Sequence, residues 1–311
     1  MRRPAIPVIV LGSLFVVGSV GANEWAPPSK QSNAGDSISQ GFNANGWPWD
    51  HPGLSWVQGT DDRVDSTAER LASTYGSAFS QEGQSVTGAE MVGGSDNFPA
   101  QAMRICAEAV KPTRVRVLLG SNDVCNRDGS ATDDATANLY SVETYLNAFR
   151  AGIDQLVACL PPKAVVQVLS FPRVDKVYDA GHAKSAWCYL GVWPLAGICR
   201  IVTNESSSDR RGQLGDAVDA YNDALATETQ AYATNANGKN PNGLGFFTDW
   251  VGSIASGHQN TSVGTYVFTA NDINGTDCFH PNVAGQARLA CLAWAKSPDS
   301  NSSSIDSCFA Q

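Results

Sequence analysis

Arg114-Val115-Arg116-Val117-Leu118-Leu119 is the clearest strand in the chain, and it ends at Gly120. A helical stretch opens at Ser141, where apolar residues recur with the i, i+3, i+4, i+7 spacing of one buried face. A second strong strand follows over 164–171. Two strands separated by a helix favour parallel pairing through a right-handed crossover. The sequence therefore predicts an α/β fold built on a parallel sheet.

Weaker patterns extend this arrangement in both directions along the chain. Helical spacing covers three further stretches, which are 65–75, 98–110 and 214–232. A last helix is expected to begin at Pro281, because proline suits the first helical position. Short strands are expected over 85–89 and 245–248. The segment 29–34 is polar, although a buried parallel strand is normally a continuous apolar run, and the residues alone do not explain this.

The first 22 residues are typical of a secretory signal peptide. Two arginines precede an apolar run over 5–20, and Val20-Gly21-Ala22 supplies a small-residue cleavage site. The run is shorter than the roughly 20 apolar residues that a spanning helix needs, so a stable membrane anchor is the less favoured alternative. Eight cysteines behind such a segment indicate disulfides and an oxidising compartment rather than free core thiols. We expect a secreted or periplasmic protein with one domain over 23–311.

The net charge and the spacing of cysteines and histidines limit which partners and ligands the protein is expected to bind. The first 22 residues carry two of the 21 basic residues and none of the 30 acidic ones, so the rest of the chain has a formal charge of −11. This charge repels nucleic acid and anionic membrane surfaces. No CxxC pair or His/Cys cluster has the spacing of a metal site, so neither a metal nor a cofactor is expected. The oligomeric state stays open.

The regular pattern breaks over 173–211, a segment called the insertion below. It holds Cys188 and Cys199 around an apolar run without a clean period. If these two cysteines pair, they close a 12-residue loop. We expect a disulfide-stapled insertion that forms a lid or a substrate wall, with a purely structural insertion as an equal alternative.

Three polar stretches carry chemistry. A serine such as Ser37 is a weak nucleophile unless a base takes its proton and a third group orients that base. His280 and Asp277 supply both within one turn, and Asn122 brings an amide donor for an oxyanion at the end of a strand. Each of these residues alone is more often a cap, a turn former or a surface residue, but together they indicate a hydrolase.

The combination resembles the SGNH, or GDSL, hydrolase superfamily. Its four short blocks match in order: Gly35-Asp36-Ser37-Ile38, Val86-Thr87-Gly88-Ala89, Gly120-Ser121-Asn122-Asp123 and Asp277-Cys278-Phe279-His280-Pro281. Within the superfamily, Gly53-Leu54-Ser55-Trp56 and the Asp277-to-His280 variant are similar to the phospholipase B-like branch. One departure is Gln84, which stands where an asparagine often precedes the glycine of the second block.

The resemblance implies a fold and a set of roles. The fold is a three-layer α/β/α sandwich with a five-stranded parallel sheet, the flavodoxin-like arrangement of SGNH hydrolases. Ser37 is the expected nucleophile, His280 the base and Asp277 the residue that orients it. The backbone N–H groups of Ser37 and Gly88 and the side chain of Asn122 are the expected oxyanion hole.

The substrate is less determined than the chemistry. Aromatic and aliphatic residues that are candidates for contact with substrate are Trp47, Trp49, Trp187, Tyr189, Leu190 and Trp193. For Trp47 and Trp49, capping of the core is an equal alternative. An apolar wall suits the acyl chain of a small-molecule or lipid ester, as in a carboxylesterase, lipase or lysophospholipase. A carbohydrate O-deacetylase, a non-catalytic binding module on the same scaffold, and thioesterase or peptidase activity are the alternatives.

Overall fold

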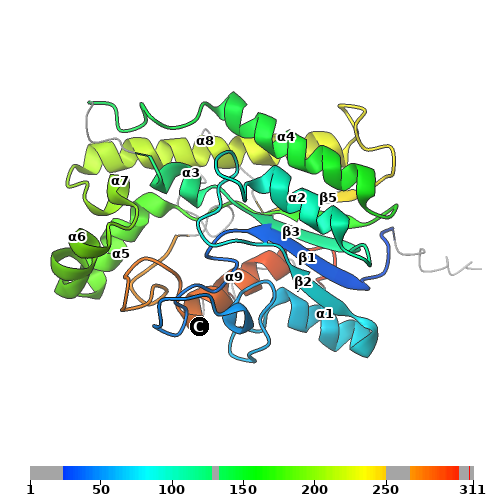
Figure 1. The fold of residues 1–311 in the computed structure, drawn as a ribbon, viewed down its shortest axis with the longest axis horizontal. Coiled ribbons are helices and arrows are strands. Elements are labelled where there is room, and N and C mark those ends of the chain that lie inside the picture. The colour runs from blue at the N-terminus through cyan, green and yellow to red at the C-terminus, as the bar shows by residue number, and fades with distance from the viewer. Residues whose placement is uncertain (1–23, 128–132, 250–266, 301–307, 309–311) are drawn as a thin grey trace, which may run out of the picture.

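The computed structural model describes residues 24–127, 133–249, 267–300 and 308. Five parallel strands form one sheet in the order β2-β1-β3-β4-β5 (Figure 1). The strands are β1 Lys30–Gly35, β2 Ser80–Gly83, β3 Arg114–Leu118, β4 Val165–Val168 and β5 Gly245–Thr248. The sheet confirms the α/β fold with five parallel strands that the sequence predicts.

Helices cover both faces of the sheet (Figure 1). One face carries α2 Phe98–Ala107, α4 Val142–Cys159 and α8 Ser208–Ala233. The other carries α1 Thr67–Tyr75 and α9 Val283–Ala295. Shorter helices are α3 Ser121–Cys125, α5 Val177–Lys184, α6 Trp193–Ala196 and α7 Arg200–Thr203, together with a π-helix over Cys188–Val192. Single 3-10 turns cover Pro52–Leu54, Gly76–Ala78 and Val174–Lys176.

Apolar side chains form an extensive buried cluster on the α2/α4/α8 face. Val115 and Val117 of β3 and Val166 of β4 point into a buried cluster with residues of these three helices. The rings of Phe98 and Phe149 stack with centroids 5.9 Å apart. Burial of this area is the main stabilising term of the fold, at roughly 25 cal/mol for each Å² of apolar surface.

The α1/α9 face has polar side chains where the first has valines. The Nε2 of Gln31 donates to the carbonyl of Val57 at 2.7 Å, and the Nε of Arg116 donates to the Oε1 of Gln31 at 3.1 Å. The Nε2 of Gln167 donates to the carbonyl of Ala293 in α9 at 2.8 Å. All six residues of β1 are buried. The polar segment 29–34 therefore overlaps a central strand whose side chains are hydrogen-bonded instead of packed in hydrocarbon.

Two predicted elements are displaced. The strand expected over 85–89 lies instead at β2, whose four residues are exposed and polar and so give no apolar signal. Residues 85–89 form a turn at Gly88, where φ is +84°. The last helix begins at Val283 rather than Pro281, because the side chain of Asn282 caps it by accepting the N–H of Gly285 at 3.0 Å. Pro281 instead forms a bridge with Ile273.

The cysteines form four disulfides, which are Cys106–Cys159, Cys125–Cys199, Cys188–Cys278 and Cys291–Cys308. The possible pairing of Cys188 with Cys199 is therefore wrong. The two residues are buried in different hydrophobic clusters, Cys199 in the α2/α4/α8 cluster and Cys188 in the α9 cluster. The insertion is stapled at two places to other parts of the chain and not to itself. No helix among the described residues combines the length and apolar character needed to cross a bilayer.

Candidate active site

Ser37 lies two residues after β1 in a tightly held turn. The carboxylate of Asp36 accepts the N–H of Ile38 at 2.9 Å, which closes a local turn around the serine. Gly35 must lack a side chain, because a Cβ there would lie 2.3 Å from the Oγ of Ser39. The serine is mostly buried, with 6 % of its surface exposed. The turn thus presents one hydroxyl at the carboxyl edge of the sheet.

Two buried glutamines fix this turn from opposite sides of the sheet. Gln101 of α2 accepts the N–H of Gly35 at 2.7 Å and donates to its carbonyl at 3.0 Å. Gln286 of α9 donates to the carbonyl of Ile38 and accepts the N–H of Trp56, both at 2.9 Å. Neither glutamine is predicted as a site residue from the sequence motifs. A polar residue at a core-facing position of a predicted helix is the signal that marks them.

His280 brings a base to the serine across 243 positions of sequence. Its Nε2 lies 2.9 Å from the Oγ of Ser37, and its Nδ1 lies 2.6 Å from the Oδ2 of Asp277. The hydrogen-bond network assigns the proton to Nδ1, since the carboxylate there can only accept, which leaves Nε2 free to accept the serine proton. The ring of Phe42 packs on the imidazole, with ring centroids 4.8 Å apart.

Asp277 sits in a turn of residues 274–281, called the histidine turn below. Its Oδ1 accepts three hydrogen bonds, from the Nδ2 of Asn274 at 2.8 Å and from the N–H groups of Phe279 and His280 at 2.9 and 3.0 Å. Burial alone would raise the pKa of Asp277, but the charge of His280 and the hydrogen bonds from it outweigh burial and lower that pKa to about 2. The carboxylate is therefore ionised at neutral pH.

The expected oxyanion donors lie on three linked segments, which are the Ser37 turn, the Gly88 turn and α3. Val86 donates its N–H to the carbonyl of Gly35 at 3.1 Å, which brings the Gly88 turn next to the end of β1. The space beside the Cα of Gly88 is open, with no atom within 4 Å of where a Cβ would stand. The Nδ2 of Asn122 donates to the carbonyl of Ala89 at 2.9 Å. One proton of that amide group is left for another acceptor.

Asp123 links the segments that carry Gly88 and Asn122, a role that the sequence motifs do not predict. Its carboxylate accepts the N–H of Met91 at 2.6 Å and the N–H of Val92 at 3.1 Å, so it ties the loop after Gly88 to α3. Burial raises the pKa of Asp123 to about 7 in spite of these hydrogen bonds. A buried carboxylate in this place holds the segments of Gly88 and Asn122 in one arrangement.

The predicted substrate wall is only partly at the surface. Trp47 and Trp49 are 60 % and 52 % exposed and stack on each other with centroids 5.5 Å apart. Trp187 and Leu190 of the insertion are exposed as well, and Tyr189 stacks on His182 at 4.0 Å. Trp193 has no exposed surface and packs against Gly181. It is a core residue in this structure, not part of a wall.

The polar atoms described above form one continuous series from Asp277 through His280 to Ser37. This series can move a proton from a hydroxyl to an imidazole, which is what an oxygen nucleophile requires. Among the described residues, no group of three His, Cys, Asp or Glu side chains could hold a metal ion.

The chain was compared with solved structures and with curated protein sequences. Among solved structures, the chain is similar to the psychrotrophic esterase EstA from Pseudoalteromonas sp., with a TM-score of 0.41 and 11 % identity over 86 % of this chain and 96 % of that one. It is also similar to a lipase/acylhydrolase from Enterococcus faecalis, with a TM-score of 0.39 and 15 % identity over 85 % and 92 % of the two chains. No curated protein sequence matches significantly.

The family model for GDSL-like lipase/acylhydrolase matches residues 33–292. This range contains all four sequence blocks on which the resemblance rests. The phospholipase B-like branch stays a prediction. The protein is a hydrolase, and the chain belongs to the GDSL-like lipase/acylhydrolase family.

Proposed function

We propose that the protein is a secreted serine ester hydrolase that cleaves acyl esters through an acyl-enzyme on Ser37. The observation that carries this proposal is the 2.9 Å contact between the Oγ of Ser37 and the Nε2 of His280. The segment 1–22 is proposed to direct secretion, and residues 23–311 are proposed to form a single hydrolase domain. The four disulfides support an oxidising compartment.

The proposed reaction has two halves. In the first, His280 takes the proton of Ser37 as the Oγ attacks the ester carbonyl, and a tetrahedral intermediate forms. The intermediate collapses as His280 passes that proton to the departing alcohol, which leaves an acyl group on Ser37. In the second, His280 takes a proton from water, the hydroxide attacks the acyl carbonyl, and the proton returns to Ser37 as the acid leaves.

Asp277 and the oxyanion donors have supporting roles in this scheme. Asp277 holds the ring of His280 and stabilises the imidazolium formed in each half-reaction. The N–H groups of Ser37 and Gly88 and the amide of Asn122 are proposed to receive the negative charge of the carbonyl oxygen. Replacement of one such donor, as in Asn122→Ala, is expected to lower kcat by about 10²- to 10³-fold.

Labelling with a fluorophosphonate probe followed by peptide mapping tests the proposal. The probe phosphonylates only a serine whose proton is taken by a base, so the label is expected on the peptide that contains Ser37. The Ser37→Ala variant should remain unlabelled and should lose nearly all turnover of an activated aryl ester. Absence of labelling in the native protein would instead favour a non-catalytic binding module, and full activity of the variant would remove Ser37 from the mechanism.

The substrate class can be narrowed with two assays on the same protein. The exposed Trp187 and Leu190 support an apolar acyl chain. The stacked pair of Trp47 and Trp49 supports the second candidate, a carbohydrate O-deacetylase, because flat exposed rings pack on sugar faces. A chain-length series of nitrophenyl esters is compared with acetate release from an acetylated polysaccharide. Preference for acetyl over octanoyl together with acetate release would favour the glycan substrate.

A further inference from the structure

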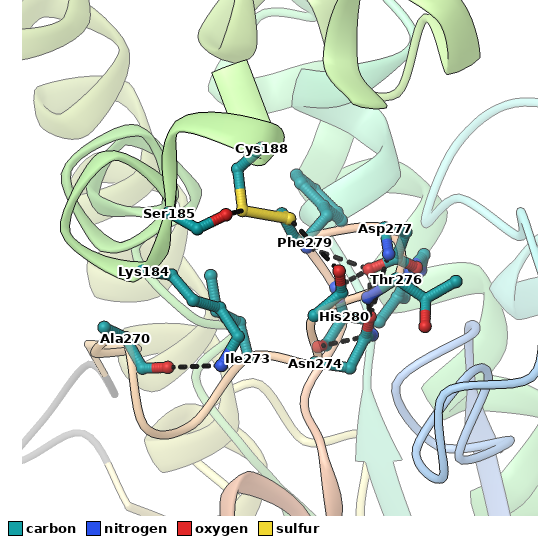
Figure 2. Close-up of a disulfide and its surroundings, with 12 residues drawn as sticks. Lys184, Ser185, Cys188, Ala270, Ile273, Asn274, Thr276, Asp277, Phe279 and His280 are labelled. Carbon is teal, nitrogen blue, oxygen red and sulfur yellow. Dashed lines mark hydrogen bonds and ion pairs between the residues drawn. A yellow bond between two sulfur atoms is a disulfide. The ribbon is translucent and has the colours of Figure 1, made fainter. Parts of the chain in front are cut away.

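One disulfide ends inside the catalytic motif itself. Cys278 lies between Asp277 and His280 in the histidine turn, and it pairs with Cys188 in the π-helix of the insertion (Figure 2). Both cysteines are completely buried. By contrast, Cys106–Cys159 joins α2 to α4 and contains no residue of the four sequence blocks. The Cys188–Cys278 bond is thus a covalent connection between the insertion and the proposed base.

The hydrogen bonds inside the histidine turn fix its shape but not its position. Asn274 donates to the carboxylate of Asp277 and to the carbonyl of His280, and Asp277 accepts N–H groups of residues in the same turn. All of these partners move together if the turn moves. They therefore preserve the Asp277–His280 contact, whereas the distance from His280 to Ser37 depends on contacts with residues outside the turn.

Noncovalent contacts also tie the same loop to the rest of the protein, among them the packing of Phe42 on His280 and a polar side-chain contact between Asn43 and Asp277. The Nζ of Lys184, in α5 of the insertion, donates to the carbonyl of Ala270 at 2.8 Å (Figure 2). The hydroxyl of Thr276 donates to the carbonyl of Gly46 at 2.8 Å, at an exposed position. Water can replace the hydrogen bonds of Lys184 and Thr276, whereas it cannot replace a covalent bond.

The backbone of Cys278 adds a second observation. Its φ is +57°, in the left-handed region that residues with a Cβ rarely adopt. Such a conformation persists only where the surroundings enforce it. The side chain of Cys278 is bonded to Cys188, within the α9 hydrophobic cluster that also holds Trp193 and Leu289.

We propose that the Cys188–Cys278 disulfide is a positioning element that places His280 over Ser37 and thereby couples the insertion to catalysis. The inference rests on the proposed function, because it assigns His280 as the base. The hydrogen bonds of the turn set the orientation of the imidazole toward Asp277. The disulfide sets the distance from the imidazole to the serine.

The test compares two paired replacements in the full chain. Cys188→Ala/Cys278→Ala removes the positioning bond without leaving a free thiol, and Cys106→Ala/Cys159→Ala is the matched control. Both variants are expected to have a lower Tm, because each loses a bond that closes a long loop. Kinetics are measured at a temperature where both variants are fully folded by circular dichroism. The substrate is p-nitrophenyl acetate, whose short acyl group depends little on the insertion.

A positioning role predicts a split between kinetic constants. The Cys188→Ala/Cys278→Ala variant should lose about 10²-fold in kcat, as a displacement of about 1 Å does, while KM changes little. The rate of fluorophosphonate labelling should fall with kcat. The control should keep kcat and the labelling rate within about twofold of the native protein. Equal loss in both variants, or unchanged kcat in the first, would overturn the proposal.

Hydrogen–deuterium exchange supplies a readout that does not depend on turnover. Backbone amides of the histidine turn should exchange faster in Cys188→Ala/Cys278→Ala than in the native protein, and at the native rate in the control. Equal exchange in all three proteins would overturn the positioning role even if the native protein hydrolysed no ester. An inactive and unlabelled native protein with the expected exchange difference would instead reject the proposed function alone.

Discussion

The two faces of the sheet differ in the side chains that the strands present to the helices. The difference separates residues that mainly stabilise the fold from residues that hold atoms at fixed distances. Toward α2, α4 and α8 the strands present valines to an apolar cluster. Toward α1 and α9 they present Gln31, Arg116 and Gln167, which are fully buried or nearly so. Apolar packing tolerates rearrangement as long as volume is kept, whereas hydrogen bonds hold particular atoms at particular distances. The second face is the one that carries α9 and the histidine turn.

Arg116 is a buried charge on the polar face, and its desolvation is unfavourable. Its guanidinium has no exposed surface, and burial lowers its pKa to about 10, so it still carries its charge at neutral pH. Asp299, which is held by Arg114 through hydrogen bonds of 2.7–3.1 Å, lies 3.8 Å from the Nη2 of Arg116. Buried ions of this kind add little net stability. These polar contacts therefore fix geometry, and apolar burial supplies most of the free energy of folding.

The largest effect is expected on the apolar face. Phe149→Ala removes a fully buried ring between α4 and α2 and should lower the free energy of unfolding by about 3–5 kcal/mol. Specific activity of the folded fraction should stay close to native, because the ring packs on Phe98 of α2 and is not one of the residues that hydrogen-bond the Ser37 turn. Urea titration and kcat on one sample measure both quantities. A loss of kcat in fully folded protein would show that the apolar face also positions the site.

The next largest effect combines stability with activity. Gln286→Leu leaves the carbonyl of Ile38 and the N–H of Trp56 without their buried partner, which should cost about 2–4 kcal/mol, or about 1–2 kcal/mol for each group. The turn of Ser37 then loses its tie to α9, so kcat should fall about tenfold or more. A variant that loses stability but keeps native kcat would show that this polar contact is only structural.

Acid should weaken the contact between Asp277 and His280. The pKa of Asp277 is lowered to about 2 in the fold, against an ordinary value of 3.8, so its ionised form stabilises the fold by about 2 kcal/mol. Because the folded pKa is the lower one, this contribution is present above about pH 4 and is lost as pH falls toward 2.

The matched variant for this titration is Asp277→Asn, which cannot ionise. The difference in unfolding free energy between the native protein and the variant should shrink by about 2 kcal/mol between pH 5 and pH 2. Denaturant titrations at several pH values measure it. A difference that does not change with pH would mean that the carboxylate gains nothing from its contact with His280.

The smallest effect separates polar residues that position the site from those that do not. Gln167→Leu removes one hydrogen bond to Ala293 and also removes an Oε1 that is buried without a partner. The two changes oppose each other, so the free energy of unfolding should change by less than about 1 kcal/mol. Activity should be native, since Gln167 lies away from Ser37. Chemical denaturation and a kinetic assay test both parts.

The sequence predicts the elements whose burial produces a clear period. β3, β4 and α4 lie close to their expected places because their apolar residues follow one face or one continuous run. β2 was misplaced since an exposed edge strand carries no such signal. The polarity of β1 is explained only by partners such as Glu108, which accepts from the hydroxyl of Ser32 at 2.6 Å and is distant in sequence.

The site was predictable to the extent that it resides in short motifs. Ser37, Asp277 and His280 are in contact as the motifs predict. Gln101 and Gln286 were not recognisable, because their role depends on which backbone atoms they meet in space. The disulfide pairing could not be predicted for a similar reason. Eight cysteines allow 105 pairings, and which cysteines are buried in the same cluster is known only from the structure.

The separation of Ser37 from His280 along the chain has a consequence for biosynthesis. The ribosome makes the serine 243 residues before the imidazole that it contacts, and the cysteine partner in the insertion 90 residues before Cys278. On the proposed mechanism, a nascent polypeptide therefore has no hydrolytic power until His280 has been synthesised. The cell that makes this protein is shielded from its activity up to that point.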